Sequence, residues 1–348
     1  MKETYTALRE FGAAFLGPAL TVYARAVEKE APGKLPVCLA REGWLLHQLL
    51  THLYDEGLIH LDRPPVYLKV SRTLLFRAIL GEAATWDIAL KMEFEGTVLE
   101  LLMKRFGLQM HEAYAAMPPE VLGFTLSLPD QMDEVREWLT PHAERLKQQV
   151  ASTREATYSY FQDQGLTQEA VVPLMLDVGY SGSIQKLCTR FLQCDTAGLY
   201  FVATKPGQQS LGDQVASIKG VFREGVAWKE NYTLLERSLL LECMMTAPHG
   251  QVVDIRQSQD GDYLFFYGRE ASSQRYYQNL EAVLEGARDA VTEALRNKVT
   301  YSVGEVEALY EVFATRRGAI PQAVWHLFTA DDDITGNGMV NPLKIFGI

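Results

Sequence analysis

Apolar and polar positions along the first 80 residues follow the order of a strand, a helix and a second strand. The almost wholly apolar run LPVCLA at 35–40 predicts a buried strand. Leucines over 46–53 recur at intervals of three and four residues and indicate one face of a helix. Residues 66–70 then alternate apolar and polar side chains, as a further strand does. A helical stretch over 5–29, closed by a Pro-Gly pair, precedes this unit.

The same alternation returns after a long helical stretch. Residues 77–165 are rich in Leu, Met, Glu, Lys and Gln and predict several helices broken at prolines. The run VVPLML at 171–176 then predicts a strand, the apolar spacing over 184–192 predicts a helix, and AGLYFVAT at 197–204 predicts another strand. Strands and helices in this order indicate a mainly parallel sheet with helices on both faces, and ligands bind such sheets at the carboxyl ends of the strands.

The last third of the chain reads as mostly helical. It contains one β-like piece, DYLFFYG at 262–268, and a long amphipathic helix through 277–291. We therefore predict an α/β fold in two parts. Residues 1–223 form an α/β domain with a helical insertion at about 77–165, and residues 224–348 form a mostly helical C-terminal lobe.

The net charge of the chain argues against one class of partner. The 348 residues include 33 Lys or Arg and 44 Asp or Glu, which gives a formal net charge of −11. Non-specific binding to nucleic acid requires the opposite sign, so we expect no nucleic-acid partner. An anionic ligand has to be held by a local cluster of positive groups.

Cysteine usage and the N-terminal residues indicate a cytoplasmic protein. The four cysteines contain no C-x-x-C pair and sit among apolar neighbours, as small buried hydrophobic residues do; they are Cys38, Cys188, Cys194 and Cys243. This pattern favours a reducing compartment and no zinc. The first residues lack the features of a signal peptide, and no stretch approaches the roughly 20 apolar residues of a membrane span. We expect at most peripheral contact, at the inner face of the membrane.

The segment LMLDVGYSGSIQKL carries the strongest local signal for ligand binding. A strand ends at Asp177, a glycine- and serine-rich turn follows, and a helix begins. Unpaired N–H groups and the helix dipole favour an anion at such a helix start, and glycine allows its close approach. The candidate phosphate ligands are Gly179, Tyr180, Ser181, Gly182 and Ser183. The alternative is that a serine only caps the helix and the glycines only relieve the turn.

Three further positions follow predicted strands at the same edge of the sheet. Arg41-Glu42-Gly43 comes after the first strand, and an arginine there can clamp a phosphate group with two hydrogen bonds. Ser71 and Arg72 follow the next strand, and Lys205 follows the strand over 197–204. Each is a candidate phosphate ligand, and for each the alternative is an ordinary surface residue.

Together the two strand–turn–helix segments resemble the two halves of a type I phosphoribosyltransferase. LAREGW stands in place of that family's diphosphate loop, and LMLDVGYSGSI in place of its acidic pair and 5-phosphate loop. Set without gaps, the family's second acid falls on Asp177 and its phosphate loop on 180–184. The first acid falls on Leu176 and the terminal threonine on Ile184. These two departures disfavour nucleobase salvage.

A closer likeness covers most of the chain. The segments GPALTVYARAV, LAREGW, YLKVSR, DVGYSGSIQ and LLLECMMTAPHG resemble, in order, bacterial polysaccharide-assembly proteins first grouped with HAD-type hydrolases. Those members that are understood are glycan phosphoribosyltransferases. The resemblance implies transfer of a 5-phosphoribosyl unit from phosphoribosyl pyrophosphate to a free or lipid-linked glycan in O-antigen or capsule biosynthesis. It also implies that a separate HAD-type phosphatase removes the 5-phosphate.

The resemblance assigns a task to each candidate residue. Arg41 and the backbone of Glu42 and Gly43 hold the diphosphate, whose oxygens Mg²⁺ bridges. Asp177 binds the ribose hydroxyls and is the one expected metal ligand, and residues 181–183 bind the 5-phosphate. A general base must also take the proton of the acceptor hydroxyl. The sequence offers three candidates for it and does not choose among them: Glu42, Glu242 and His249.

Three other functions remain open at this level. A nucleobase phosphoribosyltransferase is disfavoured by Leu176 and by the large helical insertion, and a non-catalytic binding module with the same fold stays possible because the first acid is missing. A HAD hydrolase is the third. Residues 331–335 formally match its D-x-D-x-T motif, but their place near the end of the sequence favours a solvated acidic loop. The same stretch mimics the start of an EF-hand, yet Pro342 occupies the position of the bidentate glutamate.

Overall fold

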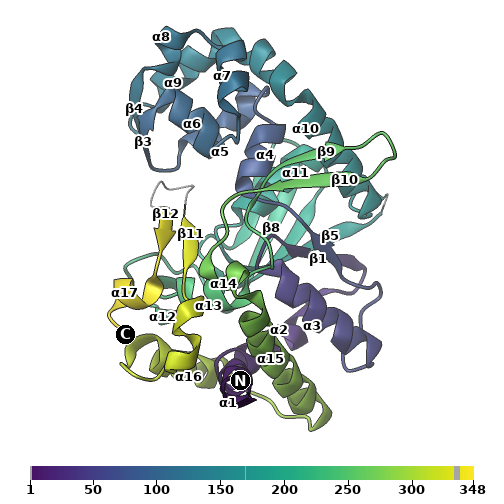
Figure 1. Cartoon of the computed structure of the whole chain (residues 1–348). Coiled ribbons are helices and arrows are strands. Elements are labelled where there is room, and N and C mark those ends of the chain that lie inside the picture. The colour runs from purple at the N-terminus through teal and green to yellow at the C-terminus, as the bar shows by residue number, and fades with distance from the viewer. Residues whose placement is uncertain (1, 169, 333–337) are drawn as a thin grey trace.

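A six-stranded sheet lies at the centre of the computed structural model, which describes residues 2–168, 170–332 and 338–348 (Figure 1). Its parallel strands are β1 (Lys34–Leu39), β2 (Val66–Leu68), β5 (Val172–Tyr180), β6 (Thr196–Ala203) and β8 (Gln214–Glu224). The remaining strand, β7 (Gly207–Leu211), pairs antiparallel with β8 at the edge. The spatial order is β2-β1-β5-β6-β8-β7. The predicted mixed α/β fold with a mainly parallel sheet is confirmed, although β7 and β8 had not been predicted.

The strand order places a ligand crevice at the centre of the sheet. Among themselves, the five parallel strands follow a 2-1-3-4-5 order, so the direction of winding reverses between β1 and β5. Helices after these two strands lie on opposite faces, which opens a crevice at their carboxyl ends. Arg41 follows β1 and Asp177 lies near the end of β5, so both reach this switch point.

Alternate residues of the central strands enter two separate cores. Cys38 and Leu176 contribute to one core, whereas their neighbours Val37 and Met175 contribute to the other. The first core packs against α1 (Lys2–Phe15), α2 (Gly17–Glu30), α3 (Gly43–Asp55) and α15 (Tyr277–Arg296). The second packs against α4 (Arg72–Ala78), α10 (Ala143–Asp163) and α11 (Ser183–Leu192). Both faces of the sheet are therefore covered, as predicted.

The insertion is mainly helical but contains a small antiparallel sheet. Its helices are η1 (Ala83–Thr85), α5 (Trp86–Leu90), α6 (Val98–Lys104), α7 (Met110–Ala116), α8 (Pro119–Leu122), α9 (Met132–Leu139) and η2 (Thr140–His142), and α10 leads back to the main sheet. The expectation of helices alone was wrong, because β3 (Phe94–Thr97) pairs with β4 (Thr125–Leu128). Strands of four residues are too short to display a clear period in the sequence, so only tertiary contacts define them.

The chain after residue 224 packs on both sides of the sheet. Its helices besides α15 are α12 (Thr233–Glu236), α13 (Leu239–Met245), α14 (Ser272–Arg275), α16 (Val303–Thr315), η3 (Gln322–Leu327) and α17 (Pro342–Phe346). Two hairpins accompany them: β9 (Val252–Gln257) with β10 (Tyr263–Tyr267), and β11 (Ala330–Asp332) with β12 (Gly338–Val340). Helix α15 packs on α1, whereas β9 packs on α4 and α10. The division at residue 223 stays a prediction, and Asp333, Ile334 and Thr335 of the acidic stretch lie outside the described residues.

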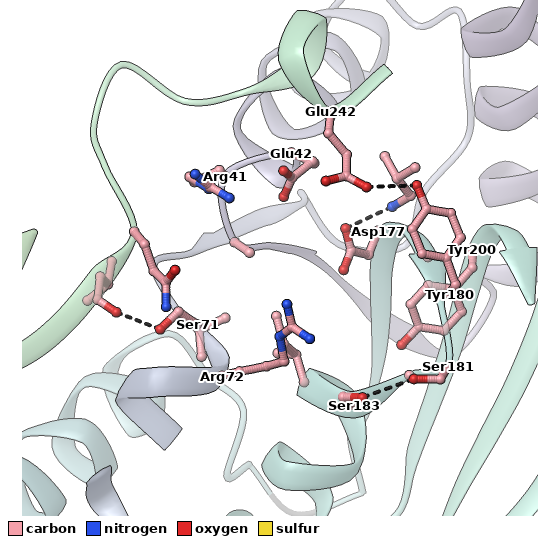
Figure 2. A pocket seen from close by; sticks show the side chains of 18 of the residues that line it. Arg41, Glu42, Ser71, Arg72, Asp177, Tyr180, Ser181, Ser183, Tyr200 and Glu242 are labelled. Atoms are coloured by element: carbon pink, nitrogen blue, oxygen red, sulfur yellow. Dashed lines mark hydrogen bonds between the residues drawn. The ribbon is translucent and has the colours of Figure 1, made fainter. Parts of the chain in front are cut away.

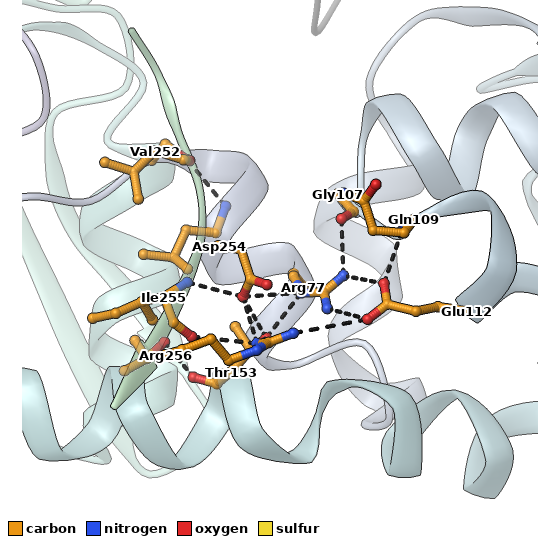
Figure 3. Close-up of polar contacts among 12 residues, drawn as sticks. Arg77, Gly107, Gln109, Glu112, Thr153, Val252, Asp254, Ile255 and Arg256 are labelled. Carbon is orange, nitrogen blue, oxygen red and sulfur yellow. Dashed lines mark hydrogen bonds and ion pairs between the residues drawn. The ribbon is translucent and has the colours of Figure 1, made fainter. Parts of the chain in front are cut away.

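A buried ionic network holds the β9–β10 hairpin on the insertion (Figure 3). The fully buried guanidinium of Arg77 donates two hydrogen bonds to the carboxylate of Glu112, at 2.8 and 2.6 Å. It also donates to Thr153 Oγ1 at 2.8 Å and lies 3.2 Å from Asp254 Oδ1. Arg256 pairs with the same Asp254 oxygen at 2.7 Å. Because Arg77 lies in the last turn of α4, this network fixes the hairpin relative to the helix that follows β2.

Two further expectations concern cysteines and membranes. All four cysteines are free thiols; Cys38, Cys188 and Cys243 are buried as predicted, but Cys194 is partly exposed because it follows the end of α11. Within the described part of the chain, no helix combines the length and apolarity that crossing a bilayer requires.

Candidate functional site

A pocket of about 320 Å³ opens at the carboxyl ends of β1, β2 and β5, where the strand order reverses (Figure 2). Most of the residues expected to bind a ligand line it: Arg41, Glu42, Ser71, Arg72, Asp177, Gly179, Tyr180, Ser181, Gly182, Ser183, Glu242 and His249. Gly43 and Lys205 do not. The structure therefore brings together side chains from both strand–turn–helix segments and from the C-terminal third of the chain.

The turn after β5 is shaped by one glycine. Gly182 has a φ of +68° and precedes α11, and a Cβ atom there would lie 2.6 Å from Ile218 Cδ1. Both the left-handed backbone and the close contact require glycine. The hydroxyls of Ser181 and Ser183 lie 3.0 Å apart across this turn and line the pocket. The serines therefore face the pocket on either side of a residue that no other amino acid replaces without strain.

The start of α11 presents backbone donors to the same space. The first intrahelical hydrogen bond runs from the N–H of Lys186 to the carbonyl of Gly182, so the N–H groups of residues 183–185 precede the helical ladder. The N-cap residue is glycine, which has no side chain that could accept from them. Such a helix start, with its dipole, is a ready site for a phosphate group.

The segment after β1 combines an unusual backbone with a packing requirement. Ala40 has a φ of +58°, a left-handed conformation that costs about 1 kcal/mol or more outside glycine. Arg41 and Glu42 follow it and line the pocket. A Cβ atom on Gly43 would lie only 2.5 Å from the carbonyl carbon of Cys38. Gly43 thus lets α3 approach β1 closely. It does not line the pocket, so its role is in packing.

Ser71 and Arg72 reach the pocket from the start of α4, and they differ in what they offer. The Ser71 hydroxyl accepts from the N–H of Leu74 at 3.0 Å and donates to the carbonyl of Val252 at 2.5 Å. It caps the helix and ties β9 to it, so its proton is already used. Arg72 points toward Asp177 across the pocket (Figure 2). The guanidinium of Arg72 carries the positive charge that suits an anion, which the Ser71 hydroxyl lacks.

Three carboxylates, those of Glu42, Asp177 and Glu242, line the same pocket. Asp177 is only 7% exposed and accepts from the N–H of Val178 at 2.8 Å. Burial, reinforced by the negative charge of Glu42, raises its pKa well above the usual range. Burial and then the charge of Glu42 raise the pKa of Glu242 to about 7, although its Oε1 accepts from the Tyr180 hydroxyl at 2.9 Å. Near neutral pH Glu242 is thus poised between its two protonation states, as a general base requires.

His249 is engaged with its surroundings. Its Nε2 lies 3.0 Å from the Tyr67 hydroxyl, its Nδ1 lies 2.8 Å from the carbonyl of Gly250, and its ring stacks on Tyr267. Burial lowers its pKa, which favours the neutral ring. Both ring nitrogens of His249 have hydrogen-bond partners, whereas only one carboxylate oxygen of Glu242, Oε1, is used by the Tyr180 hydroxyl. The geometry therefore favours Glu242 over His249 as the base.

Lys205 lies beside the pocket. It is exposed and does not contribute to the lining. Burial lowers the pKa of Lys186 in α11, and the nearby charge of Lys205 lowers it further. The two lysines thus place positive charge near the first turn of α11, outside the pocket wall.

Several lining residues had not been foreseen from the sequence. They come from the ends of β6 and β8 and from the segment before β9, and they include Tyr200, Thr204, Trp228 and Gln251. Trp228 carries a detectable signal, since it is a large apolar residue in the polar stretch REGVAWKENY directly after an alternating segment. Because β8 was not predicted, the sequence did not show that Trp228 follows a strand of the central sheet.

The raised pKa of Glu242 predicts a distinctive dependence of stability on pH. The folded chain keeps this proton up to about pH 7, whereas an unfolded glutamate releases it near 4.5. Its contribution to stability is complete below pH 4.5 and is lost as the pH rises through 7. We expect the unfolding free energy of the wild type, relative to Glu242→Gln, to fall by up to about 3 kcal/mol between pH 4.5 and 8. Urea unfolding across this range measures the difference; a constant difference would contradict the buried, protonated carboxyl.

Among the residues that the structure describes, no three His, Cys, Asp or Glu side chains converge as a ready-made metal centre. A metal ion in the pocket would therefore need oxygen ligands from a bound molecule as well as from Asp177. No protein-family model matches the chain, and no curated protein matches it significantly.

Proposed function

We propose that this chain is a glycan phosphoribosyltransferase that uses phosphoribosyl pyrophosphate as donor. One observation carries the proposal: the N-terminus of α11, two arginines and the buried carboxylate of Asp177 all line the same pocket. A ligand that suits this arrangement has two anionic ends separated by a part that offers hydroxyl groups. Phosphoribosyl pyrophosphate is such a molecule, and the pocket volume of about 320 Å³ suits a small ligand.

Each part of the donor has a complementary group. The 5-phosphate fits the turn at 181–184, where backbone N–H groups and two hydroxyls converge. The ribose hydroxyls can donate to Asp177. The diphosphate lies within reach of Arg41 and Arg72, whose planar guanidinium groups bind phosphate oxygens in pairs. Leu176 occupies the place of the missing first acid, but it is wholly buried in the core, so Glu242 supplies the second carboxylate of the pocket from α13.

The residues present fit Mg²⁺ as a companion of the donor and not as a resident ion. Asp177 keeps one carboxylate oxygen beyond its contact with Val178, and Glu42 lies nearby. Mg²⁺ prefers such hard oxygens and commonly completes its shell with substrate phosphates and water. When bound, the ion would neutralise charge on the leaving diphosphate. A cation here would also relieve the repulsion from Glu42 that contributes to the raised pKa of Asp177.

The transfer itself is a displacement at C1 of the ribose. The acceptor oxygen forms a bond to C1 while the bond from C1 to the diphosphate oxygen breaks, and the diphosphate leaves with the electron pair. Glu242 takes the proton of the acceptor hydroxyl. Arg41 and Arg72 hold the charge that develops on the leaving group, and Asp177 holds the ribose in place. The retained 5-phosphate is left for the separate phosphatase that the resemblance implies.

An acceptor assay tests this function. The purified chain is incubated with phosphoribosyl pyrophosphate, Mg²⁺ and oligosaccharides from bacterial surface polysaccharides, and products are analysed by mass spectrometry. We expect a phosphoribosyl unit on a glycan, with one diphosphate released per transfer. Free adenine, guanine, hypoxanthine and uracil serve as competing acceptors. Diphosphate release that depends on a nucleobase would contradict the proposal and support the salvage alternative.

A further inference from the structure

Trp228 stands at the mouth of the pocket with much of its ring open to solvent. Its side chain is 54% exposed, yet it belongs to the pocket lining. Its ring meets that of Tyr180 at a centroid distance of 5.8 Å and an angle of 74°. The hydroxyl of Tyr180 in turn donates to Glu242 at 2.9 Å. An exposed indole, a tyrosine and a buried carboxylate thus form one continuous side of the pocket.

The loop that carries Trp228 is held in a costly conformation. Between β8 and α12, Lys229 and Asn231 have φ values of +74° and +60°; this left-handed backbone is unfavourable for lysine, whereas asparagine tolerates it better. Two local hydrogen bonds stabilise this backbone: Ala227 N–H donates to Glu230 at 3.0 Å, and Asn231 N–H donates to Glu236 at 2.9 Å. Backbone strain of this kind accumulates where a loop has a binding task. Here it keeps a large apolar side chain out of the core and beside the pocket.

We infer that Trp228, Tyr180 and Glu242 form the acceptor subsite, in which a saccharide ring lies on the Trp228 indole and presents a hydroxyl to Glu242. This inference rests on the proposed function, since it names where the acceptor of that reaction binds. Trp228 is a specificity-determining residue in this account, and Tyr180 positions both the indole and the carboxylate.

The position of Tyr180 and Trp228 relative to the two arginines supports an acceptor subsite at these aromatic rings. Arg41 and Arg72 enter the pocket from the ends of β1 and β2, whereas Tyr180 and Trp228 enter from the ends of β5 and β8. Among the strands whose ends reach the pocket, β8 lies farthest from β1 and β2. A nucleophile that displaces the diphosphate must approach C1 from the side away from it, and the segment after β8 carries Trp228.

The chemistry of the subsite suits a sugar better than a nucleobase. A pyranose combines an apolar C–H face, which a single exposed aromatic ring can cover, with a rim of hydroxyl donors. Glu242, Glu42 and Thr204 line the pocket nearby and offer oxygens to such donors. The ring of Tyr180 meets that of Trp228 edge to face, so these two rings do not form a parallel slot for a flat base.

Binding of methyl pyranosides tests the inference without knowledge of the natural acceptor. Saturation-transfer NMR is recorded for the methyl glycosides of glucose, galactose, mannose and N-acetylglucosamine, with phosphoribosyl pyrophosphate and Mg²⁺ present. The proteins compared are the wild type, Trp228→Phe, Trp228→Ala and Trp325→Ala. Trp325 is the matched control, because it is 42% exposed but lies in η3, outside the pocket lining. Donor affinity is measured for each protein in parallel by calorimetry.

We expect at least one glycoside to bind the wild type and Trp325→Ala alike. Loss of ~60 Å² of apolar contact corresponds to about tenfold weaker binding in Trp228→Ala. Trp228→Phe should fall between, and donor affinity should stay unchanged in all variants. Three results would overturn the inference while leaving donor binding intact. The glycosides could bind Trp228→Ala as tightly as the wild type, they could bind none of the proteins, or nucleobases could bind at Trp228 in their place.

Absence of donor binding in the wild type would instead contradict the proposed function, on which the subsite rests.

Discussion

Replacement of Arg77 with alanine is expected to lower the free energy of unfolding by about 3–5 kcal/mol. Arg77 is fully buried, and its guanidinium carries two hydrogen bonds to Glu112 and contacts Thr153 and Asp254 (Figure 3). Without it, the carboxylate of Glu112, which is only 9% exposed, keeps Arg256 at 3.8 Å as its one remaining cationic contact among those described. A buried charge that loses its main partner is costly because neither water nor another close group replaces the lost interactions.

Chemical denaturation of wild type and Arg77→Ala measures this loss. Arg296→Ala is the matched control, since Arg296 forms an exposed ion pair with Glu56 at 2.6 Å and exposed pairs contribute about 0–1 kcal/mol. The contrast between the two arginines isolates the effect of burial. Equal, small losses for both variants would contradict the buried contacts of Arg77 that Figure 3 shows.

Replacement of Glu242 with glutamine is expected to reduce the rate of phosphoribosyl transfer by about 10²–10⁴-fold, the range typical of a lost general base. Glutamine keeps the size of the side chain and can still accept from the Tyr180 hydroxyl, but it cannot take a proton from the acceptor. Donor affinity should change little, because Arg41, Arg72 and the turn at 181–184 remain in place.

The comparison with the two other candidate bases makes this prediction specific. Glu42→Gln removes the charge that contributes to the raised pKa of Glu242, so it should shift the pH profile of the rate to lower pH. His249→Asn should affect the rate least, since His249 is already engaged with Tyr67 and Gly250. If His249→Asn lost most activity and Glu242→Gln kept it, the roles assigned to these residues would be reversed. Single-turnover rates across pH 5–9 separate these outcomes.

The sequence predicted those elements whose side chains meet a uniformly apolar environment. Strands β1, β5 and β6 are buried on both faces, so they appear as apolar runs followed by turn residues. Helices α3 and α11 show their buried faces directly in the spacing of apolar residues. Since the pocket lies at the ends of these elements, its glycine- and serine-rich turn and Asp177 were accessible to sequence reasoning.

The elements that escaped prediction combine buried and charged positions. In β9, Asp254 and Arg256 interrupt the apolar pattern, and these half-buried charges are stabilised by Arg77 and Glu112. In β8, a polar exposed face and a register irregularity mask the alternation. Both strands form because of contacts with residues that are remote in sequence, and a local pattern of apolar and polar residues does not reveal such contacts.

The acceptor side of the pocket shows the same limit. Glu242 and Trp228 come from segments more than 40 residues beyond the β5 turn, and only the fold brings them to Tyr180. The resemblance named Glu242 as one of three bases, but its preference over His249 depends on which atoms are already hydrogen-bonded. That information exists only in three dimensions.

Calorimetric titration of phosphoribosyl pyrophosphate into the chain, with and without Mg²⁺, tests the donor site most directly. The wild type is compared with Asp177→Asn, which keeps the shape of the side chain but replaces one carboxylate oxygen with an amide group and cannot become negatively charged. We expect saturable binding to the wild type that Mg²⁺ strengthens, and binding to the variant that is absent or at least tenfold weaker. Absence of wild-type binding under both conditions, or equal Mg²⁺-dependent binding by the variant, would contradict a donor site built around Asp177.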